Sequence, residues 1–324
     1  MNEPFASRIN LNELHTSANQ IRQEIAKVIV GQPALVNLLL TALLADGHVL
    51  IEGVPGVAKT LTARLLARTI EARFSRIQFT PDLMPSDVIG TSVFNAVRSA
   101  FEFKAGPVFA NMVLIDEINR APAKTQAALF EVMEERQVTV DGITYHLEPP
   151  FMVLATQNPV EHEGTYRLPE AQLDRFLFKL NVDYPALDEE VNILRGHLER
   201  QGIRAAEAVS AVLNIEQLIH YRSAIHQVYA EPHLLEYIAR IVHQTRSHPA
   251  LFLGASPRAS VGLLRGAQAF AALSGRDFIT PEDIRYIAPH VLRHRIMLTP
   301  EKEMEGQTPD EVIHQILQTL EVPR

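Results

Sequence analysis

Hydrophobic and polar positions follow two different spacings in the first half of the chain. Short apolar runs bounded by turn residues, such as "HVLIEG" (48–53) and "NMVLIDE" (111–117), are typical of buried strands. Longer stretches with apolar residues three or four apart predict helices. Strands are predicted at 48–53, 74–80, 111–117, 151–159 and 177–182, and helices at 17–30, 33–46, 59–72, 123–137 and 169–176. This alternation predicts an α/β fold with a parallel sheet, in which functional residues gather at the carboxyl ends of the strands.

Local signals place the ends of the first two helices. Ser17 and Gln20 form a capping-box pattern that predicts a helix start, and Gly31 is expected to stop that helix after Val30. The next helix is expected to carry Pro33 in its first turn and to end with Gly47 at a C-cap position.

Two segments with period-two patterns interrupt the alternation and predict inserted β-hairpins. They are 92–106 and 137–147, and the second contains Asp141-Gly142, a strong hairpin-turn signal. Inserted hairpins add surface to the fold, so both are candidates for contact with a partner or substrate. Their aromatic residues Phe101, Phe103 and Tyr145 fit such a contact, and packing explains them equally well.

Beyond Pro185 the strand signals disappear and helical spacing continues to the end of the chain. Helices are predicted within 187–202, 215–229, 232–248, 256–275, 280–296 and 308–320. We therefore expect an extension at 1–16, an α/β domain at 17–185 and an all-helical second domain at 186–324. His290 and His294 are four residues apart on one predicted helix, and a packed or surface pair is a better interpretation than a metal site.

Composition narrows the class of protein. The chain has 324 residues, more than one hydrophobic core usually serves, and 47% of them are hydrophobic. Its 38 acidic and 30 basic residues give a net charge of −8, so we expect no nucleic-acid partner. The absence of cysteine excludes disulfides, thiolate metal sites and cysteine nucleophiles, and it fits a reducing compartment.

Targeting signals are also not expected. The first ten residues have neither a basic region nor an apolar region typical of a signal peptide. The most apolar run, 33–53, is interrupted by Asn37, Thr41 and Asp46, short of the ~20 apolar residues that a membrane span needs. We therefore expect a cytoplasmic protein without membrane insertion.

The segment "GVPGVAKT" (53–60) between a predicted strand and a predicted helix is typical of a phosphate-binding loop. Glycines let backbone N–H groups converge on phosphates, Lys59 reaches the terminal phosphates, and the Thr60 hydroxyl binds Mg²⁺. Ala58 stands where the usual pattern has glycine. We expect it in the first helical turn with negative φ, where alanine fits as well as glycine. The alternative is an incidental glycine-rich turn. The predicted nucleotide-binding residues here are Gly53, Val54, Pro55, Gly56, Val57, Ala58, Lys59, Thr60 and Leu61.

An acidic pair ends the predicted strand at 111–117. Asp116 would hold Mg²⁺ directly or through water, and Glu117 would orient or deprotonate the attacking water. Acidic pairs also occur as solvated turns after strands. Their position one strand and one helix after the phosphate-binding loop favours the metal and catalytic interpretation.

Three segments together resemble the MoxR group of the AAA+ ATPases. They are "GVPGVAKT", "LIDEINRAPAKTQAALFEVMEERQVTVDG" and "ATQNPVEHEGTYRLPEAQLDRF". The resemblance runs from about Val28 to Pro185, and more loosely through the helical part as the family's lid domain. It implies a P-loop NTPase core with a helical lid, in which alanine at position 58 is a variant that the group usually carries.

The resemblance implies further site residues. Asn158 matches the sensor that would hold the nucleophilic water or the γ-phosphate, although alone it reads as a turn before Pro159. Val30 and Gly31 match the loop near the adenine, although alone they read as a helix end.

Two arginines matter for assembly in this family. Arg175 resembles the arginine finger that reaches the γ-phosphate of a neighbouring subunit. Arg258 resembles the lid-domain sensor, at the start of a helix that folds back over the nucleotide. An ordinary surface arginine is the alternative for each. Arg120 and Arg167 are lesser candidates for contacts between subunits.

The resemblance implies a Mg²⁺-dependent ATPase that works as a ring, most often a hexamer in the wider superfamily, with both hairpins near the central channel. ATP and ADP would be its nucleotides. Its output would be chaperone-like remodelling or maturation of a partner, usually a von Willebrand A-type protein. A metal-chelatase motor subunit is the alternative enzyme, and a scaffold or switch that binds nucleotide without hydrolysing it is the alternative from another class.

Overall fold

The computed structural model describes residues 10–159, 165–166, 168–199 and 205–323. Five parallel strands form the central sheet, in the order β2-β5-β8-β1-β9. They are β1 (His48–Gly53), β2 (Phe74–Gln78), β5 (Met112–Asp116), β8 (Met152–Gln157) and β9 (Phe176–Val182). Each corresponds to a predicted strand, so the parallel α/β core is confirmed.

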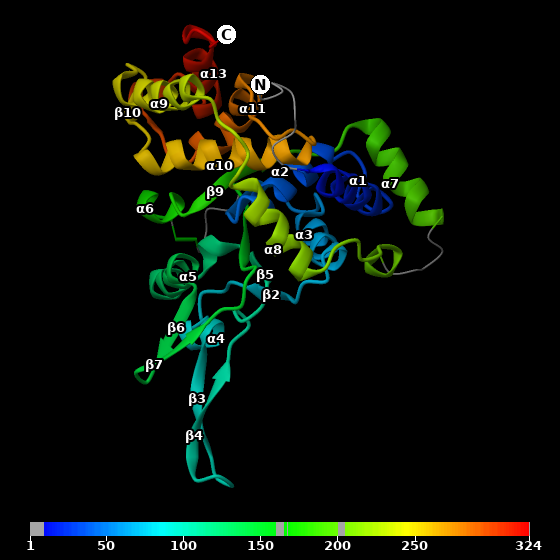
Figure 1. Ribbon diagram of the computed structural model, residues 1–324. Helices are drawn as coiled ribbons and strands as arrows, with labels where there is room; N and C mark the ends of the chain where they lie inside the picture. Colours follow the sequence, from blue (N-terminus) through cyan, green and yellow to red (C-terminus); the bar gives the residue numbers. More distant parts are fainter. Residues whose placement is uncertain (1–9, 160–164, 167, 200–204, 324) are drawn as a thin grey trace, which may run out of the picture.

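Helices cover the two faces of this sheet (Figure 1). The residues of β5 alternate between the two hydrophobic clusters: Met112 and Leu114 belong to one, Val113 and Ile115 to the other. This alternation is what two-sided burial of a parallel strand requires. The helices of this part are α1 (Asn12–Ala26), α2 (Pro33–Leu44), α3 (Lys59–Thr69), α4 (Pro85–Ile89), α5 (Ala123–Glu135) and α6 (Glu170–Leu173), with a 3₁₀ turn at Ile118–Arg120.

Three of the four predicted ends of the first two helices are wrong. Helix α1 begins five residues before Ser17, which lies inside it, because Leu14 is buried on the same face as Ala18 and Ile21 and extends the apolar stripe. The helix also ends at Ala26, earlier than predicted. Helix α2 does start at Pro33, but the left-handed residue after it is Asp46 (φ 54°) and not Gly47.

Both predicted hairpins are present. The first pairs β3 (Gly90–Asn95) with β4 (Ala100–Ala105) and projects from the body of the molecule (Figure 1). The second pairs β6 (Gln137–Val140) with β7 (Ile143–His146). Asp141 and Gly142 both have positive φ, 52° and 78°, as the tight turn of a two-residue hairpin requires.

The aromatic residues of the hairpins divide into two roles. Phe103 stacks on Tyr145 with ring centroids 4.0 Å apart, so this pair joins the two hairpins. Phe101 is 73% exposed and meets Phe94 edge-on across the first hairpin. Packing therefore accounts for Phe103 and Tyr145, whereas Phe94 and Phe101 remain on the surface.

The second half of the chain is helical, with one departure from the prediction. Two short strands, β10 (Leu251–Leu253) and β11 (Met297–Leu298), pair antiparallel between helices. Strands of three and two residues are too short to show an alternating pattern. The helices are α7 (Leu187–Glu199), α8 (Ile215–Ile225), α9 (Pro232–Ser247), α10 (Pro257–Leu273), α11 (Pro281–Leu292), α12 (Pro300–Met304) and α13 (Pro309–Thr319), with a 3₁₀ turn at Ala205–Ala208.

One hydrophobic core joins this helical half to the sheet. It contains Leu39 of α2, Leu66 of α3, Ile241 of α9 and Leu263 of α10, all nearly inaccessible to solvent. Most helices of the second half are therefore packed against the α/β core rather than tethered to it.

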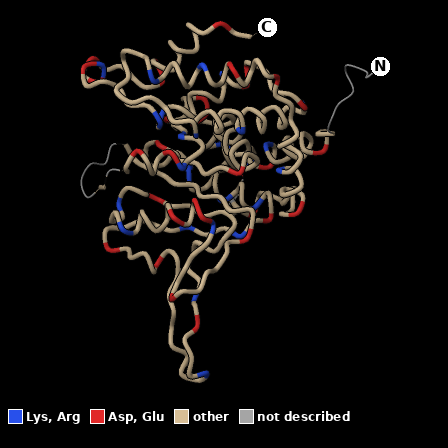
Figure 2. The backbone as a smooth tube through the Cα atoms, turned by 60° about the vertical axis from the view of Figure 1, so that its left-hand side comes forward, with Lys and Arg blue, Asp and Glu red and all other residues tan. Residues whose placement is uncertain are grey.

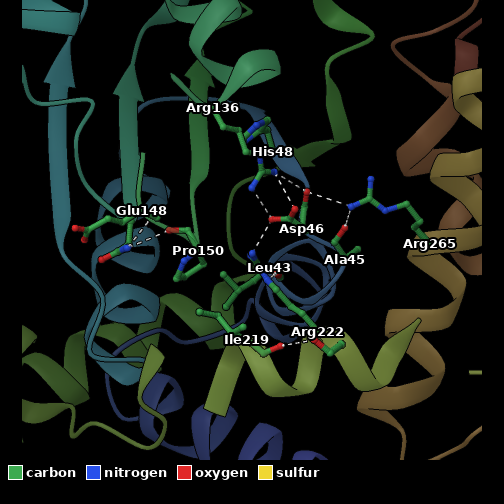
Figure 3. A network of polar contacts seen from close by, with 12 residues as sticks. Leu43, Ala45, Asp46, His48, Arg136, Glu148, Pro150, Ile219, Arg222 and Arg265 are labelled. Carbon is green, nitrogen blue, oxygen red and sulfur yellow. Dashed lines mark hydrogen bonds and ion pairs between the residues drawn. The ribbon is translucent and has the colours of Figure 1, made fainter. Parts of the chain in front are cut away.

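A polar network reinforces that junction (Figure 3). Asp46, just after α2, accepts hydrogen bonds from Arg136 at 3.0 Å and from Arg222 of α8 at 2.6 Å. Arg265 of α10 donates to the carbonyl of Ala45. Burial lowers the pKa of Arg222 to about 10, and the Asp46 carboxylate opposes that effect. Asp46 thus connects elements from both halves of the chain.

Acidic and basic residues are interspersed over the described elements (Figure 2). None of the described helices combines the length and the hydrophobicity needed to cross a membrane.

Candidate nucleotide-binding site

The loop between β1 and α3 depends on two glycines. A Cβ at Gly53 would lie 2.4 Å from the backbone oxygen of Val182, so only glycine allows β1 to approach β9 this closely. Gly56 has φ +88°, which favours glycine, and no atom of the described residues lies within 4 Å of where its Cβ would be. The loop is therefore closed on its β9 side and open at Gly56.

Ala58 does not have the conformation that we predicted. It is the N-cap of α3 with φ 58° and ψ 19°, in the left-handed region, and the helix begins at Lys59. The prediction assumed that the helix started one residue earlier. The loop makes its last turn before α3 at position 58. In such loops, residues that alternate between right- and left-handed conformations point successive N–H groups toward an anion. Alanine pays about 1–2 kcal/mol for this conformation.

Lys59 lies over the loop that it follows. Its ammonium donates to the carbonyls of Gly53 and, at 3.2 Å, Val54. The first N–H groups of α3 have no partner within the helix, and together with the helix dipole they favour an anion at this end. Gln32 donates to the carbonyl of Val57 at 3.0 Å and so ties the segment before α2 to the same loop.

Asp116, the last residue of β5, lies beside this loop. Asp116 is only 6% exposed, and its carboxylate accepts hydrogen bonds from Thr60 at 3.3 Å and from Thr156 of β8 at 3.2 Å. Arg76 of β2 donates to it at 2.6 Å. Carboxylate and hydroxyl oxygens are the ligands that Mg²⁺ prefers, and Mg²⁺ commonly combines one or two of them with phosphate oxygens and water. Asp116 and Thr60 therefore fit a Mg²⁺ that a bound nucleotide completes.

Glu117 is held in a defined orientation. Its backbone is left-handed (φ 57°), and its N–H donates to the Thr156 hydroxyl at 3.1 Å. Its carboxylate accepts from Gln78 of β2 at 2.9 Å and forms an ion pair with Arg120 at 2.8 Å. Arg120 thus has a partner within its own chain.

Asn158 follows the last residue of β8 and is 92% buried. Because β8 lies between β5 and β1, Asn158 belongs to the same carboxyl edge.

Gly31 borders a separate cavity of about 320 Å³ between α1 and α2, on the Gln32 side of the loop, whereas Val30 precedes Gly31 in the chain and does not line the cavity. Gly31 has φ 76°, and a Cβ on it would lie 2.4–2.6 Å from the carboxyl atoms of Glu189 in α7. Arg22 lines the cavity and donates to Asn37 and Asn19, each at 2.6 Å. The cavity is lined by Arg22, Gln23, Ile25, Ala26, Ile29, Gly31, Gln32, Pro33, Val36 and Asn37, a mixture of apolar and polar groups suited to a nucleobase.

The predicted arginine finger, Arg175, and the predicted lid-domain sensor, Arg258, meet at one carboxylate. Arg258 donates to Glu134 of α5 at 2.6 Å, and Arg175 lies 3.7 Å from the other oxygen of Glu134. Arg175 also donates to the carbonyl of Phe130. We call this group the arginine pair.

The arginine pair lies at the end of the sheet opposite to the phosphate-binding loop. Arg175 directly precedes Phe176, which pairs with His48, the first residue of β1. The loop starts at Gly53, five residues further, a distance of ~16 Å at about 3.3 Å per residue. Within one chain Arg258 therefore does not lie over the phosphate-binding loop, contrary to the expectation that the helix it starts folds back over the nucleotide. The lid core packs on α2 and β9, which places the start of α10 at the amino edge of the sheet.

The histidine pair is packed, as predicted. His294 is buried and bonds to the carbonyl of Phe176 at 2.9 Å. His290 lies edge-on to Phe178 and Tyr286, and burial lowers its pKa to about 3. Arg167 lies outside the described residues.

The sequence analysis missed four residues of this site. Gln78, Arg76 and Thr156 lie at or near the carboxyl ends of β2 and β8, where parallel strands gather functional groups, so their positions were a usable signal. Glu134 is one of several acidic residues on α5, and no local pattern distinguishes it.

Comparison with known proteins agrees with this geometry. Residues 48–178 match the family model "ATPase family associated with various cellular activities (AAA)", and residues 243–316 match "AAA lid domain". The chain is 50% identical to the uncharacterized protein YeaC of Bacillus subtilis, with 96% of each chain covered. It is 46% identical to Chaperone MoxR1 of Mycobacterium tuberculosis, with 96% of this chain and 84% of the relative covered.

A solved structure is similar over almost the whole chain. It is the crystal structure of an ATPase candidate from Cytophaga hutchinsonii, with a TM-score of 0.89, 42% identity, and 97% and 98% of the two chains covered. With these similarities, the parallel core and the helical lid, the chain belongs to the MoxR family of AAA+ ATPases.

Proposed function

We propose that this chain hydrolyses ATP with Mg²⁺ and uses the energy to remodel or mature a partner protein. One observation carries the proposal: Lys59, Thr60, Asp116 and Glu117 converge at one edge of the sheet, each held by named neighbours. A scaffold that only binds nucleotide needs the first three. It does not need a buttressed carboxylate such as that of Glu117.

Each residue has a role that follows from its chemistry. The α3 N-terminus and Lys59 bind the phosphates, and Thr60 with Asp116 would hold Mg²⁺, which supplies positive charge against the phosphate oxygens. Glu117 orients the attacking water and takes its proton, while Gln78 and Arg120 hold the Glu117 carboxylate. The cavity beside Gly31 would take the adenine.

The site is proposed to be completed by a neighbouring subunit. The arginine pair lies ~16 Å along the strand direction from the loop of its own chain, beyond the reach of an arginine side chain. The same arginines on an adjacent subunit would meet the phosphates in a ring, most simply a hexamer. Arg258 would then act between subunits together with Arg175.

The chaperone-like output is supported by the name of the relative MoxR1, and a von Willebrand A-type partner remains a proposal from family resemblance. The β3–β4 hairpin is a surface suited to such contact, because Val93, Phe94, Val97 and Phe101 are exposed on it. The family membership favours this output over a metal-chelatase motor.

Mixing two inactive variants tests the shared site. Lys59→Ala removes the phosphate contact, and Arg175→Ala removes the finger. A mixed ring contains some sites with an intact loop on one subunit and an intact finger on the next, so ATPase activity should reappear on mixing and disappear with excess EDTA.

No activity in the mixture, while the unmixed wild type is active and both variants assemble, would contradict completion by a neighbour. A wild type that binds ATP but never turns it over, even when assembled, would instead favour the scaffold alternative.

A further inference from the structure

Helix α7 carries an apolar stripe that the described part of its own chain leaves exposed. Leu187, Val191, Leu194 and Leu198 recur at spacings of four, three and four residues on one side of the helix. Leu187 is 80% exposed, Leu194 66% and Leu198 76%, and within the described part of the chain no residue of α7 is buried. We call these four residues the α7 stripe.

An apolar helix face of this kind is normally packed against another apolar surface. Surface helices of globular proteins normally turn their apolar side to the core, and a helix of 13 residues is marginally stable in water without tertiary packing. Contiguous apolar surface of this kind marks sites of protein contact.

A second exposed apolar surface lies close to Arg258 of the arginine pair in the chain. Phe252 and Leu253 of β10 and Val261 of α10 are 73%, 46% and 57% exposed. Val261 lies one turn after Arg258 on α10, and Ser256 donates to Asp174 at 3.1 Å, which brings the β10–α10 connection next to Arg175. We call Phe252, Leu253 and Val261 the β10 patch.

The two surfaces flank the two halves of the proposed shared site. The first turn of α7 contacts Gly31 through Glu189, so the α7 stripe begins at the predicted adenine loop. The β10 patch borders the arginines that would act on a neighbour. Figure 1 shows α7 and β10 on opposite sides of the molecule.

We propose that the α7 stripe of one subunit docks on the β10 patch of a second copy of this chain. The inference rests on the proposed shared site, and it names the surfaces that bring two subunits together. Different patches on opposite sides form a head-to-tail contact, which closes into a ring when the rotation permits. The same contact carries Arg175 and Arg258 toward the nucleotide that lies beside α7.

The charges around the two surfaces are complementary. The first turn of α7 contains Asp188, Glu189 and Glu190. On the other side, two arginines share the single carboxylate of Glu134. A second copy therefore matches both the apolar and the charged parts of each surface.

Cysteine cross-linking tests the contact, because the chain contains no cysteine of its own. We would prepare Leu194→Cys, Phe252→Cys and the double variant, assemble each with ATP, and add a short bismaleimide. The double variant should give a ladder of covalent oligomers that ends at the ring size. An equimolar mixture of the single variants should give dimers only, and each single variant alone should remain a monomer.

The proposal would be overturned if no ladder formed from this double variant and none formed from a second double variant that carries Val261→Cys in place of Phe252→Cys. Dimers from Leu194→Cys alone would also overturn it, because they would mean that the α7 stripe pairs with itself. The proposal would also be overturned if a different protein bound to the α7 stripe of a ring that is already assembled.

Serine substitution gives an independent measurement. Replacing both Leu194 and Leu198 by serine should weaken subunit association at least ~10-fold in sedimentation velocity, since two exposed leucines would no longer be buried. Leu235→Ser, at an exposed leucine of α9, is the matched control and should leave association unchanged.

Equal association of the leucine double variant and the control would contradict the docking. Both readouts report assembly and not hydrolysis. A ladder without ATPase activity would therefore count against the proposed function and leave the docking intact. ATPase activity that returns on subunit mixing, without any ladder, would count against the docking and leave the proposed function intact.

Discussion

Replacing Ala58 by glycine changes one methyl group at the entrance to α3 and should stabilise the protein. Ala58 is held at φ 58°, a conformation that costs alanine about 1–2 kcal/mol and glycine almost nothing. The left-handed turn is required here because the loop must reverse before Lys59 begins the helix.

Two opposing effects reduce the expected gain. Glycine has more freedom in the unfolded chain, which costs about 0.5–1 kcal/mol. The Ala58 methyl is partly buried against the main hydrophobic cluster, and its loss costs a few tenths of a kcal/mol on the scale of ~0.8 per fully buried methylene. The net result is a stabilisation of about 0.5 kcal/mol.

Urea unfolding compared with a matched variant decides the question. Ala127 is exposed in the interior of α5, so Ala127→Gly should destabilise by about 1 kcal/mol. The midpoint should move up for Ala58→Gly and down for Ala127→Gly at similar m-values. Equal destabilisation by the two substitutions would refute the left-handed assignment of Ala58 and restore the helical conformation expected from sequence.

Three further predictions follow from the same contacts. Lys59→Ala should weaken ATP binding ~10- to 100-fold in a titration, because charge-assisted hydrogen bonds contribute about 1.5–3 kcal/mol, and unchanged affinity would contradict the phosphate-binding assignment. Gly53→Ala should destabilise by about 1–3 kcal/mol in urea because its methyl meets Val182, whereas Gly262→Ala, with side-chain contacts at 3.4 Å in helix α10, should not destabilise. Burial lowers the pKa of His48 to about 4, so the neutral form is favoured in the folded state and stability falls as pH drops below about 6.5. The wild type should lose about 2 kcal/mol more than His48→Gln between pH 7 and pH 5, and parallel pH curves for the two would disprove this assignment.

The sequence predicted those features that depend on local pattern. The five core strands, both hairpins and the loop at 53–60 each had a spacing or turn signal of their own, and the structure has them in place. The start of α1 was missed because the polar capping pattern at Ser17 outweighed a single apolar residue, Leu14, which is buried in a core made by segments distant in the sequence.

Features that depend on packing between distant segments were not predictable in this way. Arg258 pairs with Glu134 across 124 positions in the chain, and nothing near either residue indicates which end of the sheet the lid reaches. Ala58 shows the same limit on a smaller scale, because a one-residue difference in the helix start reverses the sign of φ.

In the proposed function, Glu117 is the residue that makes this site hydrolytic. Its carboxylate is positioned by Gln78 and Arg120 beside Asp116, and glutamine keeps the shape of the side chain without its capacity to take a proton.

The most direct test is ATP binding and steady-state ATPase activity of the wild type and Glu117→Gln under assembling conditions with Mg²⁺. We expect similar ATP affinity for the two proteins and a turnover reduced by ~10²- to 10⁴-fold in the variant. Equal rates in the two proteins, whether both active or both negligible, would contradict this expectation.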